Sequence, residues 1–259
     1  MPDIDEKSLQ YHSMPIHNPF FRSQAVCFRG NIVKAELIIN KPELIPTIIP
    51  EPLVYGGNKV FIVLLEVTEL KKGFSTEHSP WTEIAIQIPV TYNAEPGLYV
   101  CENYCSDIRG IISSRETYGY PKVPGRILTH KDTTGVNVRL QKYGDNEEIM
   151  TLSYQVFSEA SPTMGPPSGG TSTKMPKIML LKYIPSATLD PKPDVRQLVA
   201  MKYGKPVIHN HSIGEGQIEI LDGAPSYLKD LGIPKAVHVS CLDMDTHLIG
   251  GDILHNYNS

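Results

Sequence analysis

The chain has 259 residues, of which 41% are hydrophobic and 20% are charged, and its formal net charge is −4. This balance is typical of a folded globular protein with a sizeable core, and it excludes an intrinsically disordered chain. The weak negative charge also argues against a protein that binds nucleic acid or an anionic membrane, because such proteins carry a basic surface.

The N-terminal residues MPDIDEKSLQ are polar and acidic, so they do not resemble a secretory signal. The longest apolar run, VFIVLLEV at 60–67, is too short to span a bilayer and is typical of a buried strand. We therefore expect a cytoplasmic protein whose cysteines are reduced and pack as small apolar side chains. These cysteines are Cys27, Cys101, Cys105 and Cys241.

Short segments rich in β-branched and aromatic residues follow one another along the chain, separated by many of its 22 prolines and 20 glycines. Because no regular βαβ alternation is present, they predict one domain, residues 1–259, of the mainly antiparallel β (α+β) class, with its sheet closed or nearly closed into a barrel. The segments lie at 31–40, 60–67, 82–92, 97–104, 136–143, 149–157, 177–184, 217–221 and 236–244.

In the segment TEIAIQIPVTY (82–92), strict alternation places Ile84, Ile86 and Ile88 on one face of a strand. Glu83 and Gln87 share the other face.

Few and short helices are expected. One begins after Asn40, with Pro42 in its first turn, and a second short turn through SRETYG (114–119) is capped by Ser113 or Ser114. The second turn must end near residue 119, because Pro121 disfavours a helical conformation for the residue before it. The residue after Pro121 is therefore expected in an extended segment.

The stretch SEASPTMGPPSGGTSTKMP, at 158–176, is rich in proline, glycine, serine and threonine. It is typical of a surface loop, and a lid over a cavity is the alternative interpretation.

Two groups of side chains could contribute to a metal site: His209 and His211 in HNH, and Asp243, Asp245 and His247 in DMDTH. Neither has the spacing of a specific metal motif, and polar alternation on exposed strands produces such pairs freely. We therefore expect no metal. The chain also lacks a G-x-S-x-G elbow, a Walker motif and a dinucleotide-binding loop.

Lys122 lies between two prolines in RETYGYPKVPGR (115–126), among aromatic and aliphatic neighbours. A lysine attacks a carbonyl only when its amine is uncharged, and burial or a nearby second cation favours that form. An ordinary solvated lysine is the alternative, because most lysines are exposed.

The segment RETYGYPKV resembles the active-site segment of the acetoacetate decarboxylase family, in which an Arg-Glu pair precedes a short turn and a Tyr-Pro-Lys whose lysine forms a Schiff base. Other segments resemble family segments in the same order, so the resemblance covers essentially the whole chain. It implies an antiparallel β cone or barrel around a central cavity, and a homo-oligomer. These segments are SMPIHNPFF (13–21), LIPTIIPEPL (44–53), TEIAIQIPVTYN (82–93), MPKIMLLKYIP (175–185) and GGDILHNY (250–257).

The residue matches imply that Lys122 is the Schiff-base lysine and that Glu83 is the active-site glutamate, a candidate proton shuttle. Arg29, Tyr120 and Gln87 are expected to contact the substrate, and Arg115 and Glu116 are expected to frame the site. No cofactor is expected. One departure is Val123, because the best-known decarboxylases of the family have a second lysine directly after the catalytic one.

The resemblance therefore implies a lyase that decarboxylates a small β-keto acid through a lysine imine. Without the second lysine, an aldolase–dehydratase acting on pyruvate-type 2-oxo acids through the same lysine is an alternative. A non-catalytic protein that binds a small keto or hydrophobic ligand is a further one.

Overall fold

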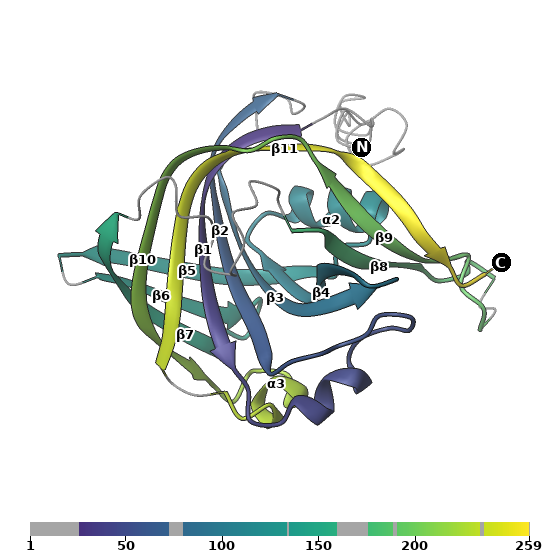
Figure 1. Cartoon of the computed structure of the whole chain (residues 1–259), viewed down its shortest axis with the longest axis horizontal. Coiled ribbons are helices and arrows are strands. Elements are labelled where there is room, and N and C mark those ends of the chain that lie inside the picture. Colours follow the sequence, from purple (N-terminus) through teal and green to yellow (C-terminus); the bar gives the residue numbers. More distant parts are fainter. Residues whose placement is uncertain are drawn as a thin grey trace, which may run out of the picture.

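The structure, a computed structural model, describes residues 26–72, 80–133, 135–159, 176–188, 191–233 and 236–258. Within these residues the strands form one 11-stranded sheet, accompanied by short helical segments (Figure 1). The helical segments are the 3-10 helix η1 (Pro42–Thr47) and the α-helices α2 (Ile108–Tyr118) and α3 (Ser226–Asp230). The strands are β1 (Val26–Ile38), β2 (Lys59–Lys72), β3 (Trp81–Tyr92), β4 (Glu95–Cys105), β5 (Lys122–Asp132), β6 (Gly135–Lys142), β7 (Glu148–Glu159), β8 (Ile178–Ile184), β9 (Val195–Tyr203), β10 (Val207–Ile220) and β11 (Ala236–Asn256).

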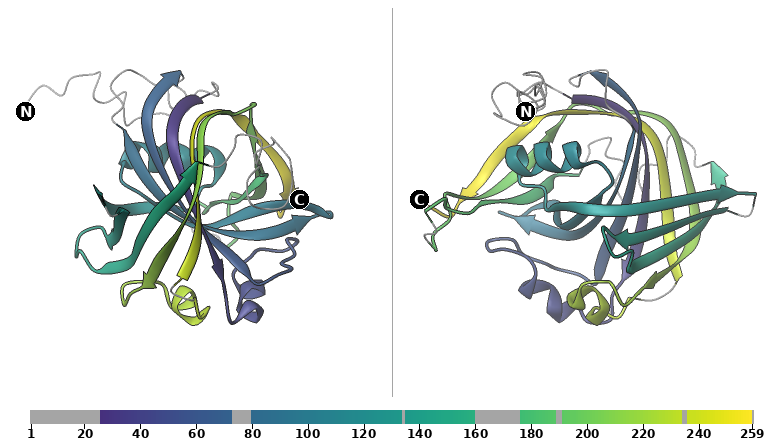
Figure 2. Two further views of the ribbon diagram at one scale, coloured as in Figure 1. Left: turned by 60° about the vertical axis from the view of Figure 1, so that its left-hand side comes forward. Right: turned by 180° about the vertical axis from the view of Figure 1, so that it is seen from behind.

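The sheet closes on itself in a ring. Its strand order is β1-β2-β3-β4-β5-β6-β7-β10-β11-β9-β8, and additional pairings join β1 to β11 and β4 to β8. One closed circuit therefore runs from β1 through β7 and returns by β10 and β11, while another leaves β4 for β8, β9 and β11 (Figures 1 and 2). The described pairings are antiparallel except β4–β5 and β4–β8. The expected fold class, a mainly antiparallel sheet closed or nearly closed with few short helices, is confirmed.

The helix α2 starts earlier in the chain than the expected turn. It begins at Ile108 rather than near the serines that were expected to cap it. Ile111, in its first turn, is 4% exposed and packs into a buried cluster, so tertiary contacts hold this end of the helix. The helix connects the parallel strands β4 and β5, whose crossover needs about a dozen residues.

Near the start of the chain, η1 contains Pro42 in its first turn as expected, but it begins after Lys41 rather than after Asn40. Strand β9 was not expected from the sequence. Its sequence VRQLVAMKY mixes apolar residues with charged ones and lacks clear alternation. It forms because β8 and β11 pair with it on both sides.

The two faces of the sheet carry different clusters of apolar side chains. Ile84, Ile86 and Ile88 of β3 pack into the larger core cluster, as their alternation predicts. This cluster also contains buried side chains of η1 and α3, which cover one end of the sheet (Figure 1). Ala85 faces the other way, into a smaller cluster with Phe61, Leu98, Val100, Ile178, Leu180 and Met201. The face opposite the main core is thus the one that carries Glu83.

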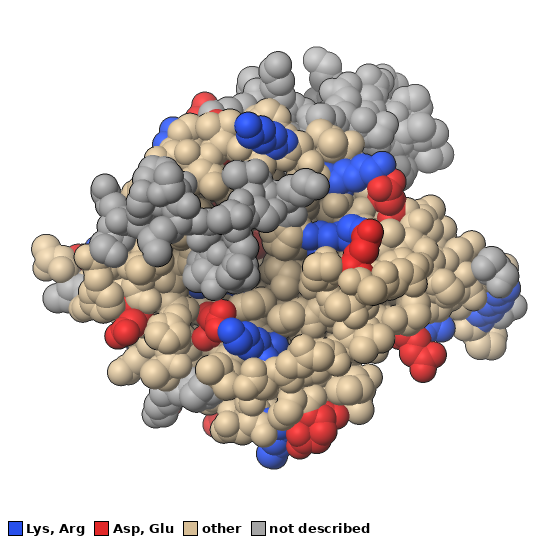
Figure 3. Space-filling model, viewed as in Figure 1, with Lys and Arg blue, Asp and Glu red and all other residues tan. Residues whose placement is uncertain are grey.

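The surface carries charges of both signs. On the face drawn in Figure 3, lysine and arginine side chains are interspersed with aspartate and glutamate, and no large patch of one sign forms among the described residues there. None of the helices in the described residues is long and apolar enough to cross a membrane.

Gly119, between α2 and Lys122, has a backbone conformation and a packing environment that require glycine. Its φ angle is +85°, and an added Cβ would lie 2.3 Å from Cα of Lys182 on β8. We expect Gly119→Ala to lower the free energy of unfolding by roughly 1–3 kcal/mol, because both the backbone and the overpacked contact are strained. Chemical denaturation followed by far-UV circular dichroism measures this loss.

Gly110→Ala, within α2, is the matched control. An added Cβ there would meet Sγ of Cys105 at 3.6 Å, which is an ordinary van der Waals contact. Because alanine favours a helix over glycine by about 1 kcal/mol, this variant should be neutral or stabilised. Equal destabilisation of the two variants would contradict the special requirement at Gly119.

Candidate active site

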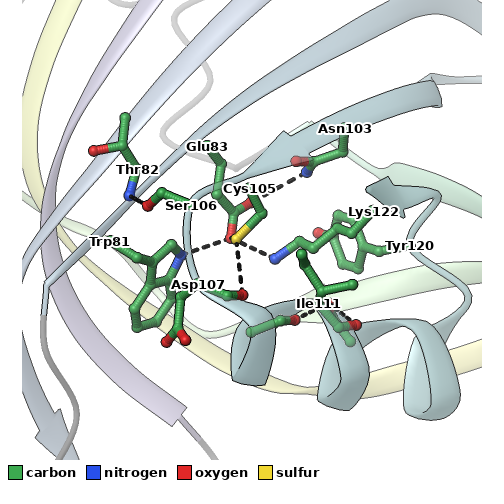
Figure 4. Close-up of polar contacts among 12 residues, drawn as sticks. Trp81, Thr82, Glu83, Asn103, Cys105, Ser106, Asp107, Ile111, Tyr120 and Lys122 are labelled. Carbon is green, nitrogen blue, oxygen red and sulfur yellow. Dashed lines mark hydrogen bonds and ion pairs between the residues drawn. The ribbon is translucent and has the colours of Figure 1, made fainter. Parts of the chain in front are cut away.

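Lys122 and Glu83 meet in a buried contact (Figure 4). Each residue is only 6% exposed, and Nζ of Lys122 donates a hydrogen bond to Oε1 of Glu83. Lys122 is therefore not an ordinary solvated lysine. A buried ion pair loses the hydration of both charges and is seldom a net source of stability, so this pair is the candidate for a functional site.

Three further side chains hold the Glu83 carboxyl group in place. Nε1 of Trp81 donates to Oε1 at 2.6 Å, and Nδ2 of Asn103 donates to Oε2 at 3.1 Å. Sγ of Cys105 lies 3.9 Å from Oε1, and burial raises the pKa of this thiol to about 12, so that it remains a donor at neutral pH. The carboxyl group is thus fixed on both oxygens, with Lys122 as its cationic partner.

The register of three strands brings these groups together. Glu83 on β3 lies opposite Cys105 on β4, and Asn103 on β4 lies opposite Lys122 at the start of β5. Trp81 is two residues before Glu83, so both side chains emerge on the same face of β3. The four polar groups around the carboxylate therefore come from adjacent strands of one sheet face.

Tyr120 borders Lys122 on another side. Nζ of Lys122 lies 5.2 Å from the centroid of the Tyr120 ring, within the range of a cation–π contact. The Tyr120 hydroxyl lies 3.1 Å from the hydroxyl of Tyr203, the last residue of β9. Burial is the main cause that raises the pKa of both phenols, that of Tyr203 to about 12.

Arg115 is tied to the lysine through the main chain. Its Nη1 donates to the carbonyl oxygen of Lys122 at 3.3 Å, which links α2 to the start of β5. Glu116, the next residue on α2, is exposed, and no described contact joins it to Lys122 or Glu83. Val123 packs against the main core, on the face opposite Lys122, so the residue at this position does not face the amine.

The structure does not bring Arg29 to the Lys122 cluster. Its guanidinium binds the carboxylate of Asp243 through two contacts, at 2.7 and 3.0 Å. The residue of β1 that approaches the cluster is Phe28, whose ring centroid lies 6.4 Å from that of Trp81. Adjacent residues of a strand point to opposite faces, which explains why Arg29 is directed elsewhere.

Gln87 lies on the face of Glu83, between Phe61 of β2 and Val100 of β4. It is four residues along the strand, about 13 Å from Glu83 by the usual rise per residue. In the part of the chain that the structure describes, no hydrogen bond joins Gln87 to Glu83 or Lys122.

The candidate metal ligands do not converge. His209 contacts Asp245 at 3.2 Å, and Nε2 of His211 lies 3.2 Å from the Ser240 hydroxyl. Among the described residues, no group of three or more histidine, cysteine, aspartate or glutamate side chains could hold a metal ion. Of the stretch considered as a lid, residues 160–175 lie outside the described part of the chain.

A model of the acetoacetate decarboxylase family matches residues 13–258. The chain belongs to this family. An acetoacetate decarboxylase of Burkholderia multivorans is 26% identical over 254 residues, covering 95% of this chain and 94% of the relative. The match over nearly the full length of both chains agrees with the resemblance expected from the sequence.

Solved structures of similar fold include both decarboxylases and other enzymes. One described as a structural study of acetoacetate decarboxylase has a TM-score of 0.80, with 19% identity, and covers 99% of this chain and 100% of that chain. The enduracididine biosynthesis enzyme MppR, complexed with pyruvate, has a TM-score of 0.73 and 14% identity, with coverage of 90% and 91%. At these identities the likeness supports the fold alone.

Trp81, Asn103, Cys105 and Tyr203 belong to the cluster but were not expected from the sequence. Trp81 could have been found, because extending the alternation of β3 back by two residues places it on the face of Glu83. Asn103 has a further distinction. Its Oδ1 atom is buried without a hydrogen-bond partner among the described residues, so it can accept a hydrogen bond from a bound molecule or water.

The indole of Trp81 should contribute to the placement of the Glu83 carboxyl group. We expect Trp81→Phe to lower the free energy of unfolding by about 1.5–3 kcal/mol, since a hydrogen bond to a charged group is lost. Denaturant titration measures this change.

Part of that loss of stability comes from the smaller phenylalanine ring. A double-mutant cycle with Glu83→Gln separates this packing contribution from the contribution of the hydrogen bond. In the Glu83→Gln background, Trp81→Phe should lower the free energy of unfolding by less than it does in the parent protein. An identical cost in both backgrounds would mean that packing alone explains the effect.

Proposed function

We propose that the protein is a lyase that decarboxylates a small β-keto acid through an imine on Lys122. The observation that carries this proposal is the buried contact between the Lys122 amine and the Glu83 carboxylate in a member of the acetoacetate decarboxylase family. A binding protein that only encloses a ketone needs neither a buried amine nor a buried carboxylate.

In the proposed reaction, the Lys122 ammonium first passes a proton to Glu83, which leaves an uncharged amine. The amine adds to the ketone carbon, and loss of water gives a protonated imine. The imine nitrogen accepts the electron pair released when the C–C bond to the carboxylate breaks and CO₂ leaves. The resulting enamine is protonated at carbon, and water hydrolyses the imine to release the ketone.

The environment of the pair supports the first and third steps. Val67, Cys105 and Ile111 form a buried cluster with Trp81, and Ala85 and Val100 belong to the neighbouring one. Proton transfer within the pair is direct, because Nζ of Lys122 already donates a hydrogen bond to Oε1 of Glu83. The apolar surroundings disfavour the carboxylate of the substrate relative to neutral CO₂.

A second candidate is an aldolase–dehydratase that joins a pyruvate-type 2-oxo acid to an aldehyde through the same imine. One observation favours it: MppR, of similar fold, has a structure complexed with the condensation product of pyruvate and imidazole 4-carboxaldehyde. In that reaction the substrate carboxylate is retained, and the enamine carbon attacks an aldehyde.

Reduction with borohydride during incubation with acetoacetate or with pyruvate, followed by peptide mass mapping, tests these proposals. Decarboxylation of acetoacetate should leave an isopropyl group on Lys122, because the product imine has lost its carboxylate. Trapping of pyruvate alone, as a carboxyethyl group, would favour the aldolase–dehydratase. If neither ketone modifies Lys122, the Schiff-base proposal is wrong and the protein is better described as a binder.

A further inference from the structure

The hydroxyl groups of Tyr120 and Tyr203 form a pair beside Lys122, with their oxygens 3.1 Å apart. The two residues reach this point from different parts of the fold, since Tyr120 precedes β5 and Tyr203 ends β9. Both pack against the smaller apolar cluster, together with Tyr118 and Leu248. The pair is thus a polar contact within largely apolar surroundings.

The two tyrosine hydroxyls have one more hydrogen-bond donor than their mutual contact needs. Two phenol hydroxyls bring two protons, and a single hydrogen bond between them engages only one. Among the contacts of the described residues, the other proton has no acceptor. A buried hydroxyl without an acceptor costs free energy, which a bound molecule with an acceptor oxygen would recover.

Both phenols stay protonated at neutral pH. Burial is the largest cause of their raised pKa values, and that of Tyr203 rises to about 12. The Glu83 charge raises both pKa values further, which indicates that the pair lies close enough to the carboxylate to experience its field. The pair is therefore suited to donate a proton rather than to accept one.

The pair and Glu83 lie on different sides of the amine. Glu83 contacts Nζ of Lys122 directly, whereas the Tyr120 ring faces Nζ from 5.2 Å (Figure 4). A ketone attacked by the amine needs an acceptor for the proton on nitrogen and a donor for the charge that develops on oxygen. In the proposed reaction Glu83 takes the first proton from the Lys122 ammonium and returns it only when water leaves, so the charge that develops on oxygen during addition requires a second group.

We propose that Tyr120 donates a proton to the carbonyl oxygen as Lys122 adds to the ketone, and that Tyr203 acts as its positioning residue. The inference rests on the proposed function, because it assigns a role within imine formation. Either hydroxyl can donate in this contact, and when Tyr203 donates to the Tyr120 oxygen the Tyr120 proton is left for the substrate.

The protons and electrons balance over the sequence. The nitrogen lone pair forms the C–N bond, the carbonyl π pair moves to oxygen, and this oxygen takes the Tyr120 proton. The phenolate then regains a proton from the newly formed ammonium group. Finally, the oxygen takes the proton held by Glu83 and leaves as water, while the nitrogen lone pair forms the C=N bond.

The test is the rate of imine formation in a single turnover, measured by rapid quenching into borohydride with acetoacetate and with pyruvate. Tyr120→Phe should slow trapping at Lys122 by about 10²-fold, as expected for loss of one donor to a developing oxyanion. Tyr203→Phe should slow it by about tenfold, the loss expected from one hydrogen bond. Tyr118→Phe, in the same cluster, is the control and should leave the rate unchanged.

The double variant Tyr120→Phe/Tyr203→Phe distinguishes a positioning role from an independent one. If Tyr203 acts only through Tyr120, the double variant should be no slower than Tyr120→Phe, because residues that act as a unit are not additive. The final amount of trapped imine should be unchanged in every variant, since a donor that accelerates both directions does not alter the equilibrium.

Several outcomes would overturn the inference. Trapping by Tyr203→Phe at the parent rate would remove Tyr203 from the reaction, and multiplicative losses in the double variant would contradict action through Tyr120. A fall in the amount of imine at an unchanged rate would indicate a structural role only. If the parent protein traps neither ketone, the Schiff-base proposal itself fails, and the inference fails with it.

Discussion

Lys122→Met should abolish turnover, with a loss of at least about 10⁴-fold, because it removes the nucleophile on which covalent catalysis depends. Methionine fills the space of the lysine stem with a flexible apolar side chain, so the surrounding packing is largely retained. The same variant should no longer be trapped by borohydride at position 122. Product release from acetoacetate and mass mapping after reduction measure the two effects.

The most informative control is Lys34→Met. Lys34 lies on β1 with Nζ 3.6 Å from the Phe61 ring centroid, and burial is the main cause that lowers its pKa. Among the described ion pairs, none joins Lys34 to a glutamate, whereas Lys122 contacts Glu83. Lys34 therefore tests whether partial desolvation alone is sufficient for an amine to form the imine. We expect Lys34→Met to keep both turnover and trapping. Loss of trapping in Lys34→Met, with trapping retained in Lys122→Met, would move the imine to Lys34.

Lys122→Met should also be less stable than the parent. It leaves the Glu83 carboxylate buried without its cation, and breaking a buried ion pair in this way costs about 3–5 kcal/mol. The double variant Lys122→Met/Glu83→Gln removes both charges and should recover much of that loss while remaining inactive. This comparison separates the role of Lys122 in the reaction from its effect on folding.

The sequence supported prediction of the strands better than of their pairing. The alternation of β3 correctly places Ile84 and Glu83 on opposite faces of the strand, and the structure shows that the face of Ile84 belongs to the main core. β9 was not predicted because its apolar and polar residues do not alternate regularly and because it is stabilised by pairing with β8 and β11 on its two sides. The earlier start of α2 likewise depends on the packing of Ile111.

A register shift explains why parts of the site could not be anticipated. The hairpin turn pairs Tyr92 with Glu95, and continuing that register unchanged would place Tyr104 opposite Glu83. A β-bulge between Ile86 and Gln87 moves the pairing by one residue, so that Cys105 lies opposite Glu83 instead. A one-residue shift exchanges the two faces of a strand, and no local signal in β4 reveals it.

The contact between Lys122 and Glu83 was expected from family resemblance rather than from the spacing of the two residues. They are 39 residues apart and belong to strands that are not neighbours, since β4 lies between them. Tyr203 was missed because a pair of hydroxyls carries no motif and only the closed sheet brings it beside Tyr120. Trp81 was missed because the alternation was followed only from residue 82 onward.

Glu83→Gln should reduce turnover by about 10²–10⁴-fold, the range expected for loss of a proton-transferring group. Glutamine keeps the shape of the side chain, and its one oxygen can accept from Trp81 in the place of Oε1, while its NH2 group takes the place of Oε2 beside Asn103. It cannot take the proton from the Lys122 ammonium or return it to the departing oxygen. Steady-state kinetics with acetoacetate measures this loss, and circular dichroism establishes that the variant remains folded.

Glu102→Gln provides the matched control for this change. Glu102 is on β4, directly before Asn103, but its carboxylate faces the other side of the strand and accepts the hydroxyls of Tyr104 and Tyr227 at 2.6 and 2.5 Å. The same substitution there removes a hydrogen-bonded carboxylate without touching Lys122, so turnover should change by no more than a few-fold. In the proposed mechanism only the carboxylate beside Lys122 transfers a proton. Equal losses of turnover in Glu83→Gln and Glu102→Gln would therefore mean that the loss in Glu83→Gln reflects lower stability. Near-parent turnover in folded Glu83→Gln would remove Glu83 from the proton transfers and leave the Lys122 amine to be deprotonated by solvent.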